Sequence, residues 1–274
     1  MLTRVQPFRN RKRLSYGQLG ILGMVLPLVL GGIGRATLLP TFGKQAPTAP
    51  HDLAEYTTKI EDLEAALRVT KLEPKELEKI GKDFATTYRL RNLTFQYKQP
   101  NKLRLVGKSP LLGTALLILN GQTRFYSIPK LGLHKVEDLA NSPSKRQSLL
   151  EYSGLLSSET LRFMQSKFLR AETLNGNATE VYELKFQGSE NASSYRVWID
   201  PKMRLVLKRE WYDMEGHLKA TFTYQEPQEV APGVWLPSQI EVKNSEGTVA
   251  ATTTYSNVKI NQGLADTLFA INKN

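Results

Sequence analysis

Cysteine is missing from all 274 residues of this chain, and histidine occurs only three times. Without cysteine the chain has no disulfide, no thiol nucleophile and no site for lipidation at a Cys side chain. His51, His134 and His217 are isolated in sequence, so they do not form the paired spacing of a metal site. Phosphate-binding glycine loops and serine-hydrolase elbows are missing as well. The sequence therefore predicts no catalytic residue, no metal and no cofactor, and we expect a protein that is not an enzyme.

Acidic residues are missing from the first 51 positions, which makes the N-terminus strongly basic. The net charge of the chain is +11, and the six Lys and Arg side chains before residue 37 account for more than half of it. In the remaining chain Lys and Arg alternate with Glu and Asp, which is typical of a solvated outer face. We therefore expect no nucleic-acid partner. A weak electrostatic role towards anionic lipid or acidic partners stays open.

The N-terminal segment has the layout of a secretory signal peptide. A basic region over residues 4–13 precedes an apolar run from Leu19 to Ile33, and small residues follow up to Ala36. The run is shorter than the roughly 20 residues that a membrane-spanning helix needs. We expect a signal peptide over residues 1–36, with an uncleaved membrane anchor as the alternative. Residues 37–50 contain three prolines and predict an extended linker. Both alternatives predict export to the periplasm or the cell envelope.

Residues 51–274 are predicted to form one domain that consists mainly of antiparallel strands. Between Tyr195 and Tyr255, alternating segments are separated by turn residues, which is typical of consecutive hairpins. The turns are predicted at Asp200-Pro201, Glu215-Gly216, 231–233 and Glu246-Gly247, and further hairpins at Asn120-Gly121 and Asn175-Gly176.

Helices are predicted in three places. Residues 52–69 have apolar side chains at three- to four-residue spacing after the potential N-cap Asp52. A second helix is predicted from Pro74, and residues 142–166 predict one or two short helices with an N-cap at Ser157. The fold class is therefore α+β, with about ten or eleven strands in a sheet that must curl or split. The helices are the available cover for its concave face.

The amount of apolar strand surface exceeds what these short helices could cover. Such apolar stripes are usually ordinary core, and a one-residue error in phase moves every side chain to the other face. The alternative is a wall that binds lipid. The candidate lipid-binding residues are Leu103, Leu105, Leu117, Tyr126, Val197, Ile199, Leu205, Leu207, Trp211 and Phe222.

The order of several short motifs resembles the outer-membrane lipoprotein-sorting proteins, which belong to the LolA/LolB-like superfamily of lipoprotein carriers. The resemblance covers roughly residues 52–271. The motifs are Gln99-Pro100-Asn101 with Arg104, Ile118 to Gly121, Tyr195 to Pro201, Lys208 to Asp213 with Gly216, Gly233 to Pro237, and the closing Asn261, Leu264 and Leu268-Phe269.

This resemblance implies a half-open β-barrel with a helical lid over a hydrophobic cavity. Such a carrier binds the acyl chains of lipoproteins, or other lipids, and transfers them between membranes without bond chemistry. The implied partners are lipidated cargo and membrane-bound donor and acceptor proteins, and we expect a monomer. The alternative is a sensing or regulatory module of the same fold that acts through a membrane protein partner.

One position departs from the family pattern. The LolA-type carriers have an arginine that latches the lid before the proline, whereas this chain has Gln99. A membrane-anchored acceptor of the LolB type would need a lipidated cysteine, which this chain lacks. The remaining lid candidates lie on the apolar side of the predicted insertion and are Leu156, Leu161 and Met164.

Overall fold

Tight turns connect the strands of this chain so that each strand pairs antiparallel with its neighbours. The computed structural model describes residues 50–57, 59–109, 113–141, 154–187 and 193–271. The predicted signal peptide and nearly all of the predicted linker lie outside these ranges. The described residues belong to one compact unit, residues 46–274.

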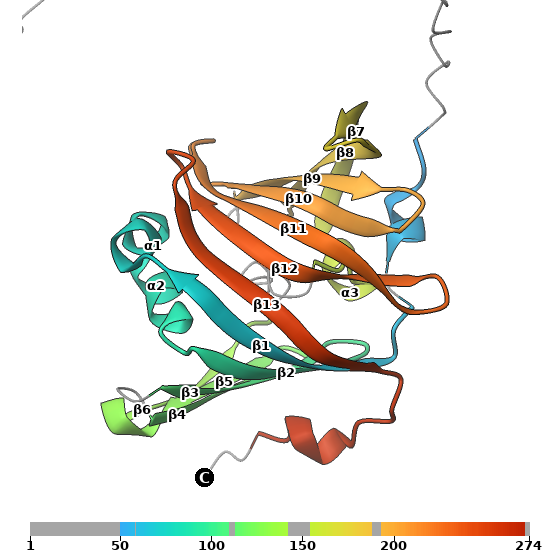
Figure 1. The fold of residues 1–274 in the computed structure, drawn as a ribbon. Helices are drawn as coiled ribbons and strands as arrows, with labels where there is room; N and C mark the ends of the chain where they lie inside the picture. Colours follow the sequence, from blue (N-terminus) through green and yellow to red (C-terminus); the bar gives the residue numbers. More distant parts are fainter. Residues whose placement is uncertain (1–49, 58, 110–112, 142–153, 188–192, 272–274) are drawn as a thin grey trace, which may run out of the picture. The chain divides into compact units, whose positions relative to one another are not determined.

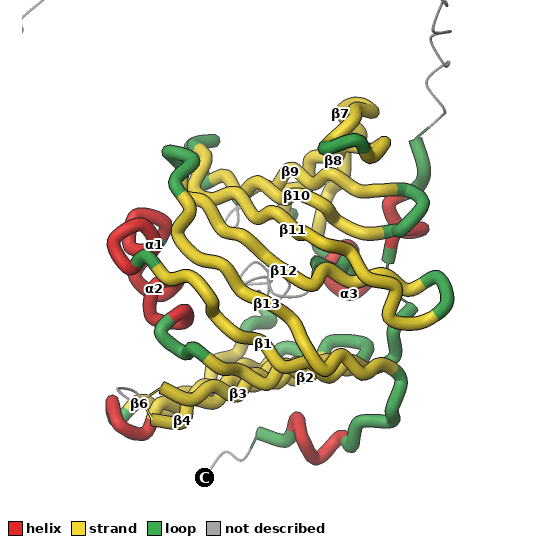
Figure 2. Tube along the Cα trace, viewed as in Figure 1, coloured by secondary structure: helices red, strands yellow, loops and turns green. Residues whose placement is uncertain are grey.

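The described strands form a single antiparallel sheet of thirteen, rather than the predicted ten or eleven. Figures 1 and 2 show that this sheet is strongly curved and open. The strands are β1 (Asp62–Leu72), β2 (Asn92–Lys98), β3 (Lys102–Ser109), β4 (Gly113–Asn120), β5 (Thr123–Ile128), β6 (Leu133–Asp138), β7 (Met164–Leu174), β8 (Asn177–Phe186), β9 (Ser194–Asp200), β10 (Leu205–Tyr212), β11 (Leu218–Ala231), β12 (Val234–Asn244) and β13 (Val249–Ile260).

The first strand joins the two halves of the sheet. The order is β6-β5-β4-β3-β2-β1-β13-β12-β11-β10-β9-β8-β7, so β1 lies between its sequence neighbour β2 and the last strand β13. Leu63 is paired with Tyr97 on one side and with Ile260 on the other. The predicted helix over residues 52–69 is therefore wrong for most of its length. Only one 3-10 turn, η1 (Leu53–Tyr56), precedes the strand, and Asp52 caps it as predicted.

The reason for this error is visible in the burial of β1. Leu63, Ala65, Leu67 and Val69 are all buried and lie two residues apart, which is strand periodicity. Residues 63 and 67 also satisfy the four-residue spacing of a helix, so the apolar pattern alone fits both structures. Pairing with β2 and β13 overrides the high helix propensity of this segment.

The predicted turns are confirmed at each site within the described residues. Gly121-Gln122 and Asn175-Gly176 are two-residue hairpin loops, and both residues of the second loop have positive φ angles, which suit the twist of the adjoining strands. The Asp200 carboxylate accepts hydrogen bonds from the backbone N–H groups of Lys202 and Met203 and so shapes the β9–β10 turn.

The described helices are short and lie at two ends of the concave face. The predicted helix from Pro74 is confirmed as α1 (Pro74–Ile80), and α2 (Lys82–Tyr88) follows it. α1 contacts β12 and β13, and the Phe84 ring of α2 lies 6.0 Å from that of Phe222. The remaining helical elements are α3 (Ser158–Leu161) and the 3-10 turns η2 (Pro129–Leu131) and η4 (Asp266–Phe269).

Within the predicted insertion 142–166, the described part begins at Gly154. Ser157 caps α3 as predicted, and its Oγ accepts a hydrogen bond from the Thr160 N–H at 3.1 Å. The predicted helix ends too late, because Met164 is already the first residue of β7. The curved antiparallel sheet agrees with the expected half-open barrel, whereas the helices cover it only in part.

The outer face of β3 to β5 is covered by the C-terminal segment. Phe269 is fully buried against Ile118 and Phe125. The Asp62 carboxylate accepts the backbone N–H groups of residues 262–264, which fixes the start of this segment. The hydrogen bonds that the Lys98 and Lys102 Nζ atoms donate to Asp266 lower the pKa of that carboxyl group to about 2.

Candidate functional site

The concave face of the sheet is lined by one large apolar cluster, which we call the inner cluster. It includes side chains from both halves of the sheet and from the two helical regions. Seven of the ten predicted lipid-binding residues belong to it or pack against it: Leu103, Leu105, Leu117, Val197, Ile199, Trp211 and Phe222. Sequence periodicity therefore places most of these residues on one common face.

The other three predicted residues are placed differently. Tyr126 is paired with Leu117 and so faces the same side, but it lies outside the inner cluster. Leu205 and Leu207 are buried, yet Val206 is the residue of this segment that enters the inner cluster. A β-bulge between Val206 and Lys208 shifts the alternation of side chains along β10 between the two faces of the sheet. Leu205 and Leu207 therefore lie outside the inner cluster, contrary to the prediction.

The predicted lid residues occupy different elements. Leu156 is in the inner cluster, Leu161 of α3 packs against it, and Met164 joins it from β7. Gln99 lies exposed in the β2–β3 turn, where its N–H donates to the Glu61 carbonyl. Gln99 follows the last residue of β2, whereas α2 precedes the first residue of this strand, which is seven residues long. Gln99 is therefore about 20 Å along the strand from the α1–α2 region.

α3 lies near the end of β2 where Gln99 follows. Burial raises the pKa of Tyr97 to about 12, and the negative charge of Glu159 in α3 contributes in the same direction. The concave face thus has helical cover at both ends, with α1 and α2 near one end of β2 and α3 near the other (Figure 1).

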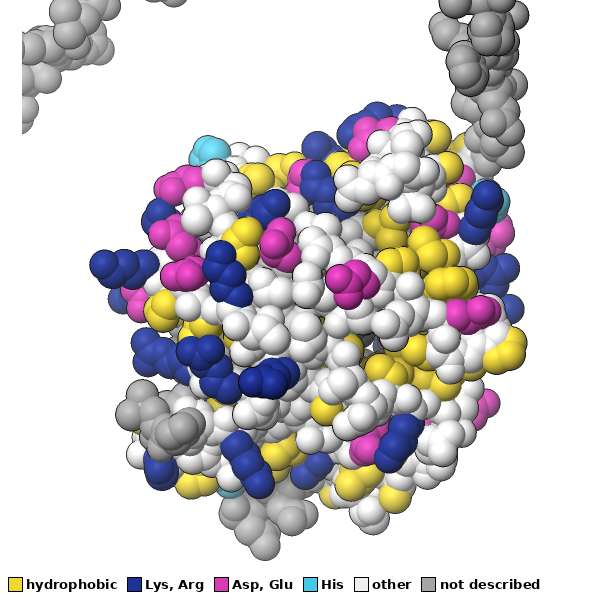
Figure 3. Space-filling model, in the orientation of Figure 1, with side chains coloured by type: hydrophobic (Ala, Val, Ile, Leu, Met, Phe, Trp, Pro, Cys, Tyr) yellow, Lys and Arg dark blue, Asp and Glu magenta, His cyan; other side chains and the backbone are white. Residues whose placement is uncertain are grey.

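A pocket of about 220 Å³ with a mixed polar and apolar lining lies beside the β11–β12 hairpin and is completed by residues 255–258 of β13. Four of its lining residues, Val230, Leu236, Tyr255 and Val258, belong to the inner cluster or pack against it. Figure 3 shows hydrophobic side chains gathered in the right half of the view, where the β11–β12 hairpin lies in Figure 1. This pocket is therefore a candidate opening to the inner cluster.

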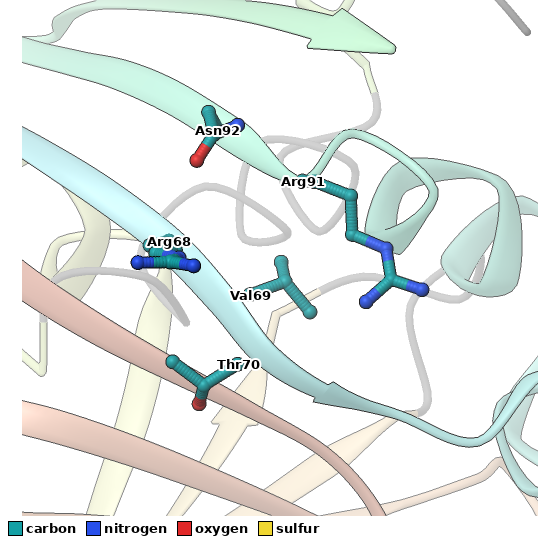
Figure 4. A pocket seen from close by; sticks show the side chains of 5 residues that line it. All are labelled: Arg68, Val69, Thr70, Arg91 and Asn92. Carbon is teal, nitrogen blue, oxygen red and sulfur yellow. The ribbon is translucent and has the colours of Figure 1, made fainter. Parts of the chain in front are cut away.

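A larger pocket, of about 630 Å³, lies where β1 and β2 stop pairing (Figure 4). Its lining residues are Arg68, Val69, Thr70, Arg91 and Asn92. Except for Val69, these residues are exposed, and the last β1–β2 pair is Arg68 with Asn92. None of them is among the predicted lipid-binding residues, so this pocket is a basic surface notch.

Sequence reasoning missed a charged group on the concave face. Arg209 is only 2% exposed, and the β10 bulge turns it towards the face of its strand partners Val197 and Phe222. Its Nε and Nη1 atoms have no hydrogen-bond partner. The nearby Trp211, two residues further along the strand, also has a buried Nε1 without a partner. The alternation of Lys, Arg and Glu in this segment suggested a solvated face, and only the bulge reveals otherwise.

A second polar group on the concave face joins residues far apart in sequence. The buried Glu180 carboxylate accepts hydrogen bonds from Tyr182 at 2.6 Å and from Tyr56 at 2.8 Å, and it contacts His51 Nδ1 at 2.7 Å. Burial opposes ionisation of Glu180, but these three bonds together lower its pKa. Burial, followed by the bonds to Glu180, raises the pKa values of Tyr56 and Tyr182. We call this hydrogen-bonded group of His51, Tyr56, Glu180 and Tyr182 the clasp. His51 is therefore paired, although it is isolated in sequence.

The β10–β11 turn brings Asp213, Glu215 and His217 together, with one ligand atom of each within 4.8 Å of the others. The Asp213 carboxylate already accepts the backbone N–H groups of Glu215 and His217. These contacts explain the arrangement as turn geometry. In the part of the chain that the structure describes, no helix is long and apolar enough to cross a membrane.

A protein family described as "Uncharacterized protein" matches residues 109–273 of the chain. No curated protein matches it in sequence. Similar solved structures include a DUF1329 family protein from Desulfovibrio piger, at 13% identity and a TM-score of 0.56, covering 80% of this chain and 92% of that one.

Two further solved structures bear on the predicted fold. A putative outer membrane lipoprotein-sorting protein domain from Vibrio parahaemolyticus has 14% identity and a TM-score of 0.54, covering 79% of this chain and 92% of that one. A LolA superfamily protein from Nitrosomonas europaea has 14% identity and a TM-score of 0.55, covering 79% and 93%. The predicted LolA-like fold is confirmed by these similarities.

Proposed function

Because the chain belongs to the family that matches residues 109–273 and has a LolA-like fold, we propose that it is an exported carrier of acyl chains. It binds lipoproteins or other lipids through the concave face of the sheet and transfers them between membranes without bond chemistry. The basic and apolar N-terminal segment supports export to the periplasm or cell envelope.

The observation that supports this proposal most is the nature of the concave face. The inner cluster extends across both halves of the sheet, but its described helical cover consists of short elements at two ends. Short helices with few contacts are easier to displace than a second sheet, because they bury less apolar surface. An acyl chain could replace them on the inner cluster, at a gain of about 0.8 kcal/mol for each buried CH₂ group.

The pocket at the end of β11 to β13 is the proposed entrance. It reaches inner-cluster residues from the surface, and Gly154 lies close to Pro237, one of its lining residues. A Cβ atom on Gly154 would lie 2.8 Å from Cδ1 of Tyr224 and 3.4 Å from Cγ of Pro237. Gly154, which precedes α3, thus lies directly against β11 and β12 next to the pocket.

The proposal is tested with the purified protein and a peptide that carries one acyl chain, with the same peptide lacking that chain as the control. We expect binding of the acylated peptide alone, measured by fluorescence anisotropy, and co-purified lipid in native mass spectra. Equal binding of both peptides, together with mass spectra free of lipid, would contradict the carrier function.

A matched pair of variants on β11 tests the entrance. Val230→Glu places a charge in the pocket, and we expect it to weaken binding of the acylated peptide at least about tenfold. Thr221→Glu introduces the same charge on the same strand but on the outer face, and we expect little change. Equal loss in both variants would argue against the pocket as the entrance.

A further inference from the structure

We propose that Arg209 binds the anionic head group of an acyl ligand on the concave face, so that the cargo is an anionic amphiphile with a carboxylate or phosphate group. This inference rests on the proposed carrier function and specifies its ligand. Its basis is a buried guanidinium group whose Nε and Nη1 atoms have no partner.

Burial of the Arg209 guanidinium group without a counter-ion is energetically costly. An arginine side chain stays protonated in proteins, so Arg209 cannot lose its charge on burial as a lysine can. Its two direct strand partners, Val197 and Phe222, are both apolar. The Tyr195 ring lies 5.9 Å from the guanidinium carbon, which is a weak compensation for a buried charge. A buried charge normally has a counter-ion, because desolvation without one is strongly unfavourable.

No described carboxylate provides that counter-ion. The buried acidic residues of the described chain are Asp62, Glu180 and Asp200. Glu180 is engaged by His51, Tyr56 and Tyr182, and the other two accept backbone N–H groups of turns and of the C-terminal segment. Glu210, which follows Arg209, faces the opposite side of the sheet and pairs with Lys208 and Arg196. Among the described residues no carboxylate is paired with Arg209, so its Nε and Nη1 donors are available to a bound anion.

The neighbourhood of Arg209 defines the chemistry of that anion. Trp211 offers a second unpaired donor, its Nε1–H, on the same strand and the same face. The surrounding residues of the inner cluster are apolar and aromatic, including Val197 and Phe222. An oxyanion attached to an acyl chain satisfies both features, because its charge meets the donors and its chain covers the apolar surface. A free inorganic anion would satisfy only the donors.

The experiment compares ligands that share one oleoyl or oleyl chain. Oleate, lysophosphatidic acid and the neutral oleyl alcohol are titrated against the purified protein, and inorganic phosphate is titrated alone. We expect at least one of the two anionic lipids to bind about 10- to 100-fold tighter than oleyl alcohol, and phosphate alone to bind far more weakly. The more tightly bound anion identifies the carboxylate or the phosphate as the head group.

Two variants assign this preference to Arg209. Arg209→Met removes the charge while keeping an unbranched side chain, and we expect it to abolish the preference and to raise the melting temperature of the ligand-free protein. Lys208→Met removes one positive charge from the same strand on the outer face, and we expect it to keep the preference. A structural role of Arg209 would instead lower the melting temperature of Arg209→Met.

The outcomes separate this inference from the proposed function. Binding of oleyl alcohol with no preference for either anion overturns the role of Arg209 and leaves the carrier function intact. A preference for an anionic lipid that persists in Arg209→Met also overturns the role of Arg209 and leaves the carrier function intact. Failure of all three lipids to bind contradicts both proposals. Because the ligand series on the unmodified protein already decides the preference, the test holds even if Arg209→Met does not fold.

Discussion

Glu180 links the beginning of the domain to β8 through side chains that are more than 120 positions apart. Its three partners, His51, Tyr56 and Tyr182, all contact the same carboxylate. A sequence pattern cannot reveal this clasp, because neither the isolated His51 nor the strand residue Glu180 has a local motif. Composition indicates only that these residues are polar or aromatic, and the sheet brings them together.

We predict that this clasp makes stability depend on pH. The folded-state pKa of Glu180 is lower than its usual 4.5, so its contribution is complete above that value and is lost as the pH falls through the folded pKa. Glu180→Gln should lower the free energy of unfolding by about 1–3 kcal/mol at pH 7 and by less at pH 3. Urea unfolding at both pH values measures the difference.

Glu183→Gln on the outer face of the same strand is the control. Among the described residues Glu183 forms an ion pair with the exposed Lys185, at 3.3 Å, so its loss should cost under about 1 kcal/mol. A loss in Glu180→Gln that is the same at pH 3 and pH 7 would mean that ionisation of this carboxyl group does not stabilise the fold.

At the scale of elements, turns were more predictable than strands. Asp, Asn and Gly residues determine the turns locally, and those predictions hold throughout the described hairpins. The nature of β1 depends on its partners β2 and β13, which its own residues do not encode. The face of the sheet on which Leu205 and Leu207 lie depends on the β10 bulge. No turn residue in the sequence indicates this bulge.

The contact between β3 and the chain after α2 should be sensitive to a single methyl group. A Cβ atom on Gly107 would lie 2.8 Å from Cβ and Cδ1 of Leu90, too close for an unstrained contact. We predict that Gly107→Ala destabilises the fold by about 1–3 kcal/mol, as measured by chemical unfolding. The cost should shrink in a Leu90→Ala background, because the clash is then removed.

Gly81→Ala, between α1 and α2, is the matched control. Its backbone is extended, and a Cβ atom there would find its nearest neighbour at 4.0 Å. This change should be neutral or stabilising by up to about 1 kcal/mol. Equal losses at both glycines would contradict the steric explanation.

The C-terminal segment should contribute strongly to stability through one aromatic side chain. Phe269 is fully buried against Ile118 and Phe125 on the outer face. We predict that Phe269→Ala lowers the free energy of unfolding by about 3–5 kcal/mol. Thr267→Ala in the same turn changes an exposed residue and should have little effect. A loss below about 1 kcal/mol at Phe269 would indicate that this segment is dispensable.

For the whole molecule, β1 is the strand that joins the two halves of the sheet, because it pairs with both β2 and β13. The curled sheet could be predicted from the number of strands, because a long sheet must bend or split. The insertion of the first strand beside the last could not, since pairing partners almost 200 residues apart have no local signature. The same limit applies to Arg209, whose face follows from the pairing of β10.

We predict that both halves unfold together. The three tryptophans, Trp198, Trp211 and Trp235, all lie in strands β9 to β12, whereas far-UV circular dichroism reports on the entire sheet. Tryptophan fluorescence and circular dichroism should therefore give the same urea midpoint. An earlier loss of the dichroism signal would show that strands β2 to β6 separate first, contrary to the shared strand β1.

The openness of the sheet has a consequence for solubility. Among the described strands, β6 and β7 each pair on one side only, so their other sides present backbone groups that a second copy could join. Both edges are rich in charge, with Lys135 and Glu137 on β6 and Lys167, Arg170 and Glu172 on β7. These side chains would have to lose water if two edges met. An open sheet of this kind thus depends on its charged edge strands to disfavour pairing between copies into larger sheets.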